Sequence, residues 1–247
     1  YDFQKKNKTK NTLFLIISKS GNTIETVSNL LSLNILKRKA KNIIVISEKN
    51  NNFLFNLSQK LNLFYIEHKN YIGGRFSVLS EVGMLPAYLM GINIKKLRSN
   101  IRKYLKNKEK IFLKNSVTKL ATALNQKNFK TLIFLNYVPE LEKFLYWCQQ
   151  LIAESLGKNS KGFLPVISNA PKDHHSLLQL YLDGPRDKIF YIFSSEEYTK
   201  SKINSKKYGN KLNYLNNKSL SEIKRSQMNA LVEVLKKYKI SFRKFRI

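Results

Sequence analysis

The sequence predicts an α/β fold made of two doubly wound, Rossmann-like domains, with mainly parallel sheets flanked by helices. Short, continuously apolar segments rich in branched residues alternate with longer segments of helical periodicity. This alternation occurs twice, on either side of a basic connector. Hydrophobic residues make up 43% of the 247-residue chain, which is enough to bury a substantial core. Folds of this kind bind ligands beyond the carboxyl ends of their strands.

The first domain is expected over residues 1–91. Its strands are short apolar runs bounded by turn-forming sequence. They are predicted at 12–17, 42–47 and 63–68. After the first strand, apolar residues recur every three or four positions, so one stripe of a helix should face the sheet. This stripe consists of Ile24, Val27, Leu30, Leu31 and Ile35. A shorter helix over 53–61 completes a βαβαβ unit.

A basic helical connector over residues 92–114 leads to a second domain, expected over residues 115–247. The second domain repeats the alternation of strands and helices. Its helices are predicted at 115–126, 139–157, 174–182 and 219–238. Its strands are predicted at 131–138, 162–168, 187–195 and 241–247. Because the sequence starts close to one strand and stops on another, we expect it to be a fragment of a longer protein.

The formal net charge of +29 raises the possibility of a nucleic-acid partner, because clustered Lys and Arg neutralise phosphates. Here Lys is mixed with Asn and Ile along the whole chain, and no Arg-rich stripe with interleaved aromatic residues occurs. This pattern favours a solvated surface over a specific nucleic-acid site. Non-specific binding to polyanions at low salt stays open.

Cofactor, membrane and export signals are missing from the sequence. The single cysteine, Cys148, excludes an internal disulfide framework and a cysteine-rich zinc site. The three histidines, His68, His174 and His175, lack the spacing of a metal motif, so no metal site is expected. No apolar run reaches 18 residues, and the N-terminus resembles no export signal. We therefore expect no membrane association and a cytoplasmic location.

The turn SKSGNT, residues 18–23, lies between a buried strand and a helix start. Free backbone N–H groups and the positive helix end favour an anion there, and three hydroxyls beside them suit a phosphate monoester. The candidate ligands are Ser18, Lys19, Ser20 and Thr23. The turn lacks the motifs of nucleotide-binding loops. The alternative is an ordinary capped turn, with Asn22 as N-cap and Glu25 closing a capping box.

The segment IGGRFSVLSEVG, residues 72–83, offers a second candidate site. A Gly-Gly pair lets backbone approach a ligand closely, and Arg75 supplies a permanent cation with a planar fork of donors. Such a group can stabilise negative charge on a bound ligand. The alternative is a tight turn before a helix that starts near Val82, with Arg75 in a structural ion pair.

The long helix over 139–157 carries a core stripe on one side. The stripe consists of Leu141, Phe144, Leu145, Cys148, Ile152 and Leu156. Gln150 and Glu154 lie four residues apart on another face, so their side chains should point the same way. The helix C-terminus disfavours negative charge, and partial burial would add to this effect, so Glu154 is a candidate general base. The alternative is an ordinary exposed helix glutamate.

The segment DHHS, residues 173–176, opens a helix further along the chain. A histidine can transfer protons near neutral pH, and either His174 or His175 could do so. The residues themselves do not choose between the two.

These segments resemble motifs of known proteins. The turn SKSGNT after a strand resembles the phosphosugar loop of sugar isomerase (SIS) domains, which many enzymes and regulators share. Residues 72–83 closely resemble a signature of the glucose-6-phosphate isomerase family. Residues 149–158, QQLIAESLGK, resemble the family segment with the catalytic glutamate, and residues 173–179 resemble its Asp-x-His-Ser segment.

The resemblance implies two SIS-type domains and the reversible conversion of glucose 6-phosphate to fructose 6-phosphate in glycolysis and gluconeogenesis, without metal or organic cofactor. It implies that His175 helps to open the sugar ring and that Glu154 moves the proton between C2 and C1. Arg75 would stabilise the enediolate between these steps. Gly74 and Gln150 join the residues of the phosphate turn as substrate-binding candidates. His174 would then be a capping or surface residue.

The family resemblance also implies a homodimer in which His175 reaches the active site of the neighbouring subunit. One departure is Glu81, where the family more often has a small residue. The family's late catalytic lysine helix and an earlier Gly- and Ser-containing phosphate loop do not occur in residues 1–247. We therefore expect this chain alone to lack isomerase activity.

Three alternatives stay open on the sequence. One is another SIS-type isomerase that also accepts mannose 6-phosphate. The second is a non-catalytic sugar-phosphate-binding regulator. The third is a basic nucleic-acid binder. The combination of Arg75, Gln150 and Glu154 argues against the second and the third alternatives.

Overall fold

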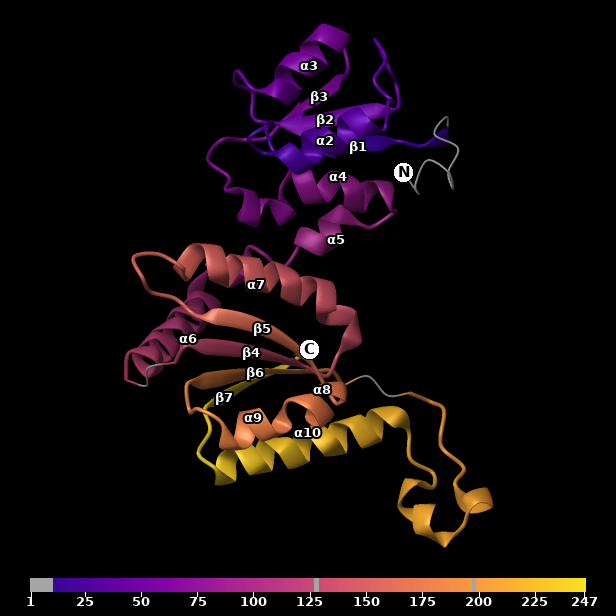
Figure 1. Ribbon diagram of the computed structural model, residues 1–247, viewed down its shortest axis with the longest axis vertical. Helices are drawn as coiled ribbons and strands as arrows, with labels where there is room; N and C mark the ends of the chain where they lie inside the picture. Colours follow the sequence, from indigo (N-terminus) through magenta and orange to yellow (C-terminus); the bar gives the residue numbers. More distant parts are fainter. Residues whose placement is uncertain (1–10, 127–128, 197–198) are drawn as a thin grey trace. The chain divides into compact units, whose positions relative to one another are not determined.

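The computed structural model describes residues 11–126, 129–196 and 199–247. The chain divides into two compact units, Tyr1–Glu109 and Lys110–Ile247 (Figure 1). The N-terminal segment 1–10, in which the sequence shows no export signal, lies outside the described residues. Among the helices of the described ranges, none is both long and apolar enough to cross a membrane.

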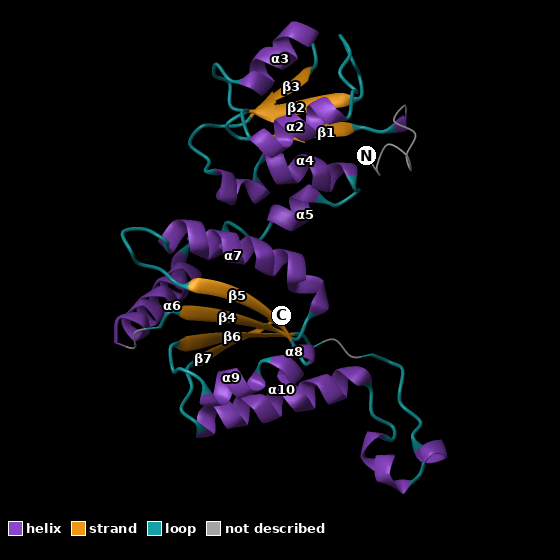
Figure 2. Ribbon diagram, in the orientation of Figure 1, coloured by secondary structure: helices purple, strands orange, loops and turns teal. Residues whose placement is uncertain are grey.

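The first unit contains a parallel sheet with strand order β1-β2-β3 (Figure 2). The strands are β1 (Phe14–Ile17), β2 (Ile43–Ser47) and β3 (Phe64–Glu67). They confirm the three predicted strands, with ends shifted by one or two residues. Because all strands are parallel, Ser18 after β1 and His68 after β3 lie at the same edge of the sheet.

Two helices flank these strands, α2 (Ile24–Ser32) and α3 (Phe53–Leu61). The predicted stripe of α2 is wrong at two positions, because the side chains of Ile24 and Leu31 are 72% and 53% exposed. The helix ends at Ser32, before the expected stripe is complete. Residues of the following loop pack against the core instead. They are Leu33, Ile35, Leu36 and Ala40.

Four short helical segments and one long helix follow β3. They are a 3₁₀ helix (Gly74–Leu79), α4 (Glu81–Leu89), α5 (Ile94–Arg98), a second 3₁₀ helix (Lys103–Leu105) and α6 (Asn107–Gln126). The helix predicted near Val82 is confirmed as α4. The helix predicted from residue 115 begins eight residues earlier, at Asn107, so this boundary was wrong. Residues 108–114 are mostly straight-chain residues with good helix propensity and contain no Gly or Pro, so nothing stops the helix there.

The second unit contains a four-stranded sheet with order β5-β4-β6-β7, in which every pair is parallel. The strands are β4 (Thr131–Asn136), β5 (Leu164–Asn169), β6 (Lys188–Ser194) and β7 (Phe242–Arg246). All four predicted strands are present. The two central strands, β4 and β6, are almost completely buried, which explains their continuously apolar sequences.

Helices cover both faces of this sheet, as the doubly wound fold requires. In Figure 1, α7 (Glu142–Leu156) lies on one face, and α9 (Leu178–Asp183) and α10 (Leu220–Lys237) lie on the other. Side chains of β4 alternate between the two cores: Leu132 and Phe134 pack on the α7 side, and Ile133 and Leu135 on the α10 side. The sheet is therefore buried on both faces.

Two details of the second unit differ from prediction. The helix expected over 174–182 is broken at Leu177, where ψ is −12° and φ is −123°, so that α8 (Lys172–Ser176) and α9 are separate. On α7, Phe144 and Leu156 are 43% and 48% exposed, although both were placed in the core stripe. Core positions of this segment instead repeat at spacings of four, three and four residues, which gives a narrow stripe. They are Leu141, Leu145, Cys148 and Ile152.

Helix α10 begins with a capping box that the sequence prediction did not identify. Ser219 is the N-cap, and its hydroxyl accepts a hydrogen bond from the Glu222 amide. The Glu222 carboxylate in turn accepts a hydrogen bond from the Ser219 amide. The hydrogen bonds that Ser219 donates lower the pKa of Glu222. Two short 3₁₀ helices, Lys206–Tyr208 and Asn210–Leu215, precede this cap.

The contribution of α7 to the core can be tested by replacing leucine with alanine at a buried and at an exposed position of the helix. Leu145→Ala removes a fully buried side chain and should lower the free energy of unfolding by about 2–5 kcal/mol. Leu156→Ala, on the same helix but half exposed, should cost less than about 1 kcal/mol. Urea unfolding of the two variants measures both values. Equal losses would show that Leu145 is not a core residue.

Candidate active site

The predicted phosphate turn brings its three hydroxyls together. Ser18 is buried at the end of β1, and its Oγ shares a 2.7 Å hydrogen bond with Thr23 Oγ1. Ser20 Oγ lies 3.5 Å from the same Thr23 oxygen and accepts a hydrogen bond from the Asn22 amide. The three hydroxyls therefore gather around the first turn of α2, where backbone N–H groups and the helix dipole favour an anion.

The alternative reading of this turn as a capping box is wrong. Thr23, not Asn22, is the N-cap of α2, and its side chain makes no capping hydrogen bond. Asn22 Oδ1 instead accepts a 2.8 Å hydrogen bond from the Phe53 amide at the start of α3. The turn after β1 is thus tied to the helix after β2, rather than closed on its own helix.

Gly21 allows this turn to approach α3 closely. Its φ is +67°, and a Cβ added there would lie 1.8 Å from Asn52 Oδ1. Asn52 is buried and caps α3 by accepting a 2.9 Å hydrogen bond from the Phe55 amide. The carbonyl of Gly21 also accepts from the Leu54 amide. The position needs glycine both for its backbone conformation and for space.

Lys19, a predicted phosphate ligand, forms an ion pair and a hydrogen bond with other residues of the first unit. Its ammonium lies 3.3 Å from a Glu48 carboxylate oxygen and donates a 3.1 Å hydrogen bond to the Asn70 carbonyl. Asn70 leads into the Gly-Gly-Arg loop. Lys19 therefore links the phosphate turn to that loop, which sequence reasoning did not foresee.

The Gly-Gly-Arg loop is a 3₁₀ helix held by its own hydroxyls. Ser77 Oγ donates to the Gly74 carbonyl, and Ser80 Oγ donates to the Ser77 carbonyl, both at 2.7 Å. A Cβ on Gly83 would lie 2.0 Å from the Val78 carbonyl oxygen, so only glycine lets α4 pack this closely on the loop. Around Gly74, by contrast, an added Cβ would meet no atom within 4 Å, which leaves room for a ligand.

Arg75 is the next residue in the sequence after Gly74. Its guanidinium carbon lies 4.8 Å from the centre of the Phe76 ring, within the range of a cation–π contact. The aromatic ring thereby restricts the orientation of the guanidinium.

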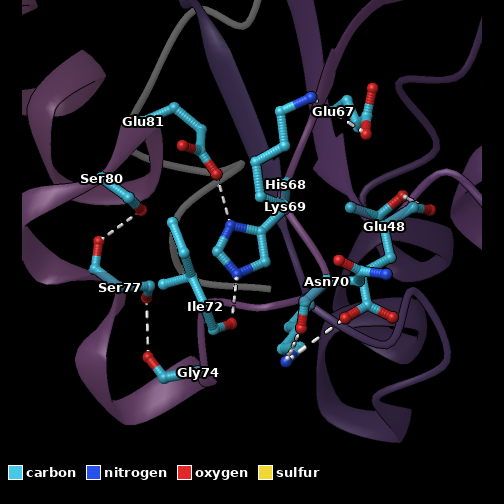
Figure 3. A network of polar contacts seen from close by, with 12 residues as sticks. Glu48, Glu67, His68, Lys69, Asn70, Ile72, Gly74, Ser77, Ser80 and Glu81 are labelled. Atoms are coloured by element: carbon cyan, nitrogen blue, oxygen red, sulfur yellow. Dashed lines mark hydrogen bonds and ion pairs between the residues drawn. The ribbon is translucent and has the colours of Figure 1, made fainter.

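His68 is a feature of this site that the prediction did not use. It is 1% exposed and lies directly after β3. Its Nδ1 contacts Glu81 Oε1, and its Nε2 lies 3.1 Å from the Ile72 carbonyl oxygen (Figure 3). The available signal was a lone histidine immediately after an apolar strand, and sequence spacing alone does not connect it to Glu81.

In the second unit, Gln150 and Glu154 point the same way, as predicted from their spacing. Gln150 Nε2 donates a 2.9 Å hydrogen bond to Glu154 Oε1. Both side chains are exposed, so the partial burial expected for Glu154 is not observed. The hydrogen bond holds the carboxylate in one orientation on the surface of α7.

His175 and His174 have different surroundings. His175 is exposed on α8, whereas His174 Nε2 lies 2.7 Å from the Tyr137 hydroxyl. Burial lowers the pKa of His174, with a further contribution from His175, and burial raises the pKa of Tyr137. A neutral His174 therefore accepts a hydrogen bond from Tyr137. His174 is a partly buried structural residue, which corrects its expected role as a capping or surface residue.

The predicted residues of the second unit lie at opposite ends of its sheet. Glu142, at the start of α7, accepts a hydrogen bond from Asn169 at the end of β5, and Gln149 donates one to Pro165 at the start of β5. Helix α7 therefore runs antiparallel to β5, and Glu154 lies beyond the amino end of that strand. His175 lies beyond its carboxyl end. At 1.5 Å per residue, α7 separates the two by roughly 20 Å.

A cavity of about 350 Å³ opens in the second unit at the ends of β4, β6 and β7. Side chains of both charges line it, including Glu140, Lys224 and Lys244. None of the predicted site residues lines this cavity, so it is separate from the candidate site. Among the residues that the structure describes, no three His, Cys, Asp or Glu side chains form a group that could hold a metal ion.

Solved structures share this arrangement of elements. A hypothetical protein from Thermus thermophilus aligns over 98% of this chain and 62% of its own, with a TM-score of 0.81 and 25% identity. A glucose-6-phosphate isomerase from Chlamydia trachomatis aligns over 94% of this chain and 47% of its own, with a TM-score of 0.63 and 16% identity. The second likeness concerns the fold alone, and both structures share the doubly wound α/β fold of this chain.

Sequence comparisons are more specific. The family model described as phosphoglucose isomerase matches residues 2–164. A probable glucose-6-phosphate isomerase from Methanococcus maripaludis is 38% identical over 76% of this chain and 44% of its own length. The glucose-6-phosphate isomerase of Mycoplasmopsis synoviae is 36% identical over 92% of this chain and 55% of its own length. The chain belongs to the phosphoglucose isomerase family, and it spans about half the length of these relatives.

The packing of the phosphate turn can be tested at Gly21. Gly21→Ala combines an unfavourable positive φ, which costs about 1–2 kcal/mol, with displacement of the Asn52 cap, which adds about 1 kcal/mol. Gly91→Ala is a matched control in the same unit, because Gly91 has a φ of +79° but open space around it. Urea unfolding should show the larger loss for Gly21→Ala. Equal losses would mean that Asn52 does not constrain the turn.

Proposed function

We propose that the full-length protein interconverts glucose 6-phosphate and fructose 6-phosphate through an enediolate, in glycolysis and gluconeogenesis, without a metal or organic cofactor. The observation that carries this proposal is the hydroxyl cluster at the start of α2, on the same sheet edge as the Gly-Gly-Arg loop, in a chain of the phosphoglucose isomerase family. The relatives reported above, which bear the name glucose-6-phosphate isomerase, support it.

The first unit would bind the substrate and stabilise its charge. Ser18, Ser20 and Thr23, with the loop amides, would hold the phosphate, since their hydroxyls already converge. Lys19 would contribute positive charge while it stays paired with Glu48. The open space at Gly74 would admit the sugar, and the Arg75 guanidinium would stabilise the enediolate, which is usually a large term in such reactions.

The second unit would supply the groups that move protons. Glu154 would take the proton from C2 and return it to C1, with its carboxylate oriented by Gln150. Gln150 would also contact the substrate. His175 would transfer the proton of ring opening. The exposed position of His175 supports this role, whereas the Nε2 of His174 is hydrogen-bonded to the Tyr137 hydroxyl.

The protein would act as a homodimer in which His175 serves the neighbouring subunit. Within one unit, Glu154 and His175 lie beyond opposite ends of β5, so one substrate molecule cannot touch both. A His175 from a second copy removes this conflict. Helix α6 also exposes four large apolar side chains, Ile111, Phe112, Leu113 and Val117, which supports an association surface.

The two sheets of this chain would belong to two separate domains. The two parallel sheets would be the centres of two SIS domains, one within residues 1–91 and one within residues 115–247, joined by residues 92–114. The protein would be cytoplasmic, with no specific nucleic-acid or membrane partner.

Two alternatives can be separated from this reaction. Another SIS-type isomerase would turn over mannose 6-phosphate as well as glucose 6-phosphate. A sugar-phosphate-binding regulator would bind glucose 6-phosphate but would not exchange its C2 proton with deuterated water.

Glu154 provides the direct test of the reaction. Glu154→Gln in the full-length protein should lower kcat by about 10²–10⁴-fold, because the amide cannot accept the C2 proton. Glu140→Gln, the same substitution at an exposed position before α7, should leave kcat unchanged. Coupled assays of fructose 6-phosphate formation measure both. Undiminished turnover in Glu154→Gln would remove this residue from the mechanism.

Subunit complementation tests the donated histidine. Full-length chains carrying Glu154→Gln and chains carrying His175→Asn should each be nearly inactive alone. Co-expressed chains should recover roughly a quarter of wild-type activity, because a mixed dimer contains one site with both native residues. If both residues act within one chain, co-expression should recover none.

A further inference from the structure

His68 joins both ends of the Gly-Gly-Arg loop to the sheet. Its amide donates a 2.8 Å hydrogen bond to the Ser47 carbonyl, which fixes the backbone of His68 to β2. Its Nε2 contacts the carbonyl of Ile72, just before the loop, and its Nδ1 contacts Glu81, just after it (Figure 3). A single buried side chain thus holds the entry and the exit of the segment that contains Arg75.

The hydrogen-bonding groups determine how this contact works. A carbonyl oxygen only accepts, so His68 Nε2 must carry a proton and donate it to Ile72. Nδ1 and the Glu81 carboxyl then share one further proton, either as an imidazolium with a carboxylate or as a neutral imidazole with a carboxylic acid. Both ring nitrogens are used in either case, so the imidazole cannot rotate without losing two contacts.

The loop between these contacts has little apolar support. Arg75, Phe76 and Val78 are exposed or half exposed, and only Ser77 in the 3₁₀ helix is buried. The hydroxyl bonds of Ser77 and Ser80 hold the loop internally but do not attach it to the sheet. His68, whose backbone belongs to the edge of the sheet, attaches the segment at Ile72 and at Glu81, and Lys19 adds a contact just before it, at Asn70.

We propose that His68 and Glu81 are positioning residues that set the placement of Arg75 for the proposed reaction. The inference rests on the proposed role of Arg75 at the enediolate. His68 and Glu81 would not touch the substrate. They would fix the loop so that the guanidinium meets charge that develops only in the transition state, where small displacements are costly.

The experiment is a double-mutant cycle in the full-length protein. His68→Gln keeps a donor for Ile72 but loses the contact with Glu81, and should lower kcat about ten- to a hundredfold with less than about a twofold change in KM. In an Arg75→Ala background the same substitution should have almost no further effect, because the residue that it positions is gone. Additive losses would overturn the inference.

A matched control and a second variant make the result specific. Glu67→Gln changes the residue next to His68, where the carboxylate pairs with Lys69 on the surface, and should leave kcat unchanged. Glu81→Ala removes the side-chain group that contacts His68 Nδ1 and should repeat the effect of His68→Gln, also where His68→Gln fails to fold. If Glu81→Ala matches wild type, the contact between His68 and Glu81 is not needed and the inference fails.

Hydrogen exchange gives a readout that does not depend on activity. The amides of Phe76 and Ser80 donate within the loop, to Gly73 and Ser77. In His68→Gln they should exchange faster than in wild type, while the Gly21 amide of the phosphate turn stays protected. Unchanged exchange at Phe76 and Ser80 would overturn the inference. A different failure, full kcat in Arg75→Ala alone, would remove Arg75 from the proposed function itself.

Discussion

Parallel strand pairing is the constraint on which the rest of this structure depends. In a parallel sheet, every strand delivers its following loop to the same edge. In the first unit, the hydroxyl turn after β1 and the Gly-Gly-Arg loop after β3 therefore share an edge, although they are far apart in the sequence. The contact of Lys19 with the Asn70 carbonyl shows how near they come. Two segments with different chemistry are thus brought to the same edge by the pairing of the strands that precede them.

The same constraint has the opposite result in the second unit. A helix that follows a parallel strand returns antiparallel to it, so residues near its C-terminus reach the amino edge of the sheet. Glu154, on α7, is carried to that edge, whereas His175, shortly after β5, stays at the carboxyl edge. In the proposed reaction, Glu154 and His175 would therefore come from two copies of this unit. The course of the chain through the sheet, more than any side-chain contact, is what supports this proposal.

The sequence predicted what depends on local periodicity. Every strand and most helices follow from apolar runs and three- or four-residue spacings, and the Gln150–Glu154 bond follows from helix geometry. It could not predict contacts that depend on where distant elements meet. Asn22 resembled the cap of its own helix, yet its side chain reaches Phe53. Likewise, Glu81 contacts His68 only because α4 begins beside the end of β3.

Polar groups buried at the shared edge explain why these loops adopt one arrangement. Ser47, Asn52 and His68 are nearly inaccessible. Ser47 and Asn52 donate hydrogen bonds to the Glu48 carbonyl, directly after β2, and His68 contacts the Ile72 carbonyl, after β3. Apolar contacts can be repacked at a small cost in stability. A buried donor or acceptor that loses its partner, by contrast, destabilises the folded state by about 1–3 kcal/mol. The edge of the sheet therefore admits few alternative loop conformations. In the proposed reaction, a charged substrate at this edge would meet donors that are already oriented, so the protein would not need to reorganise when charge develops.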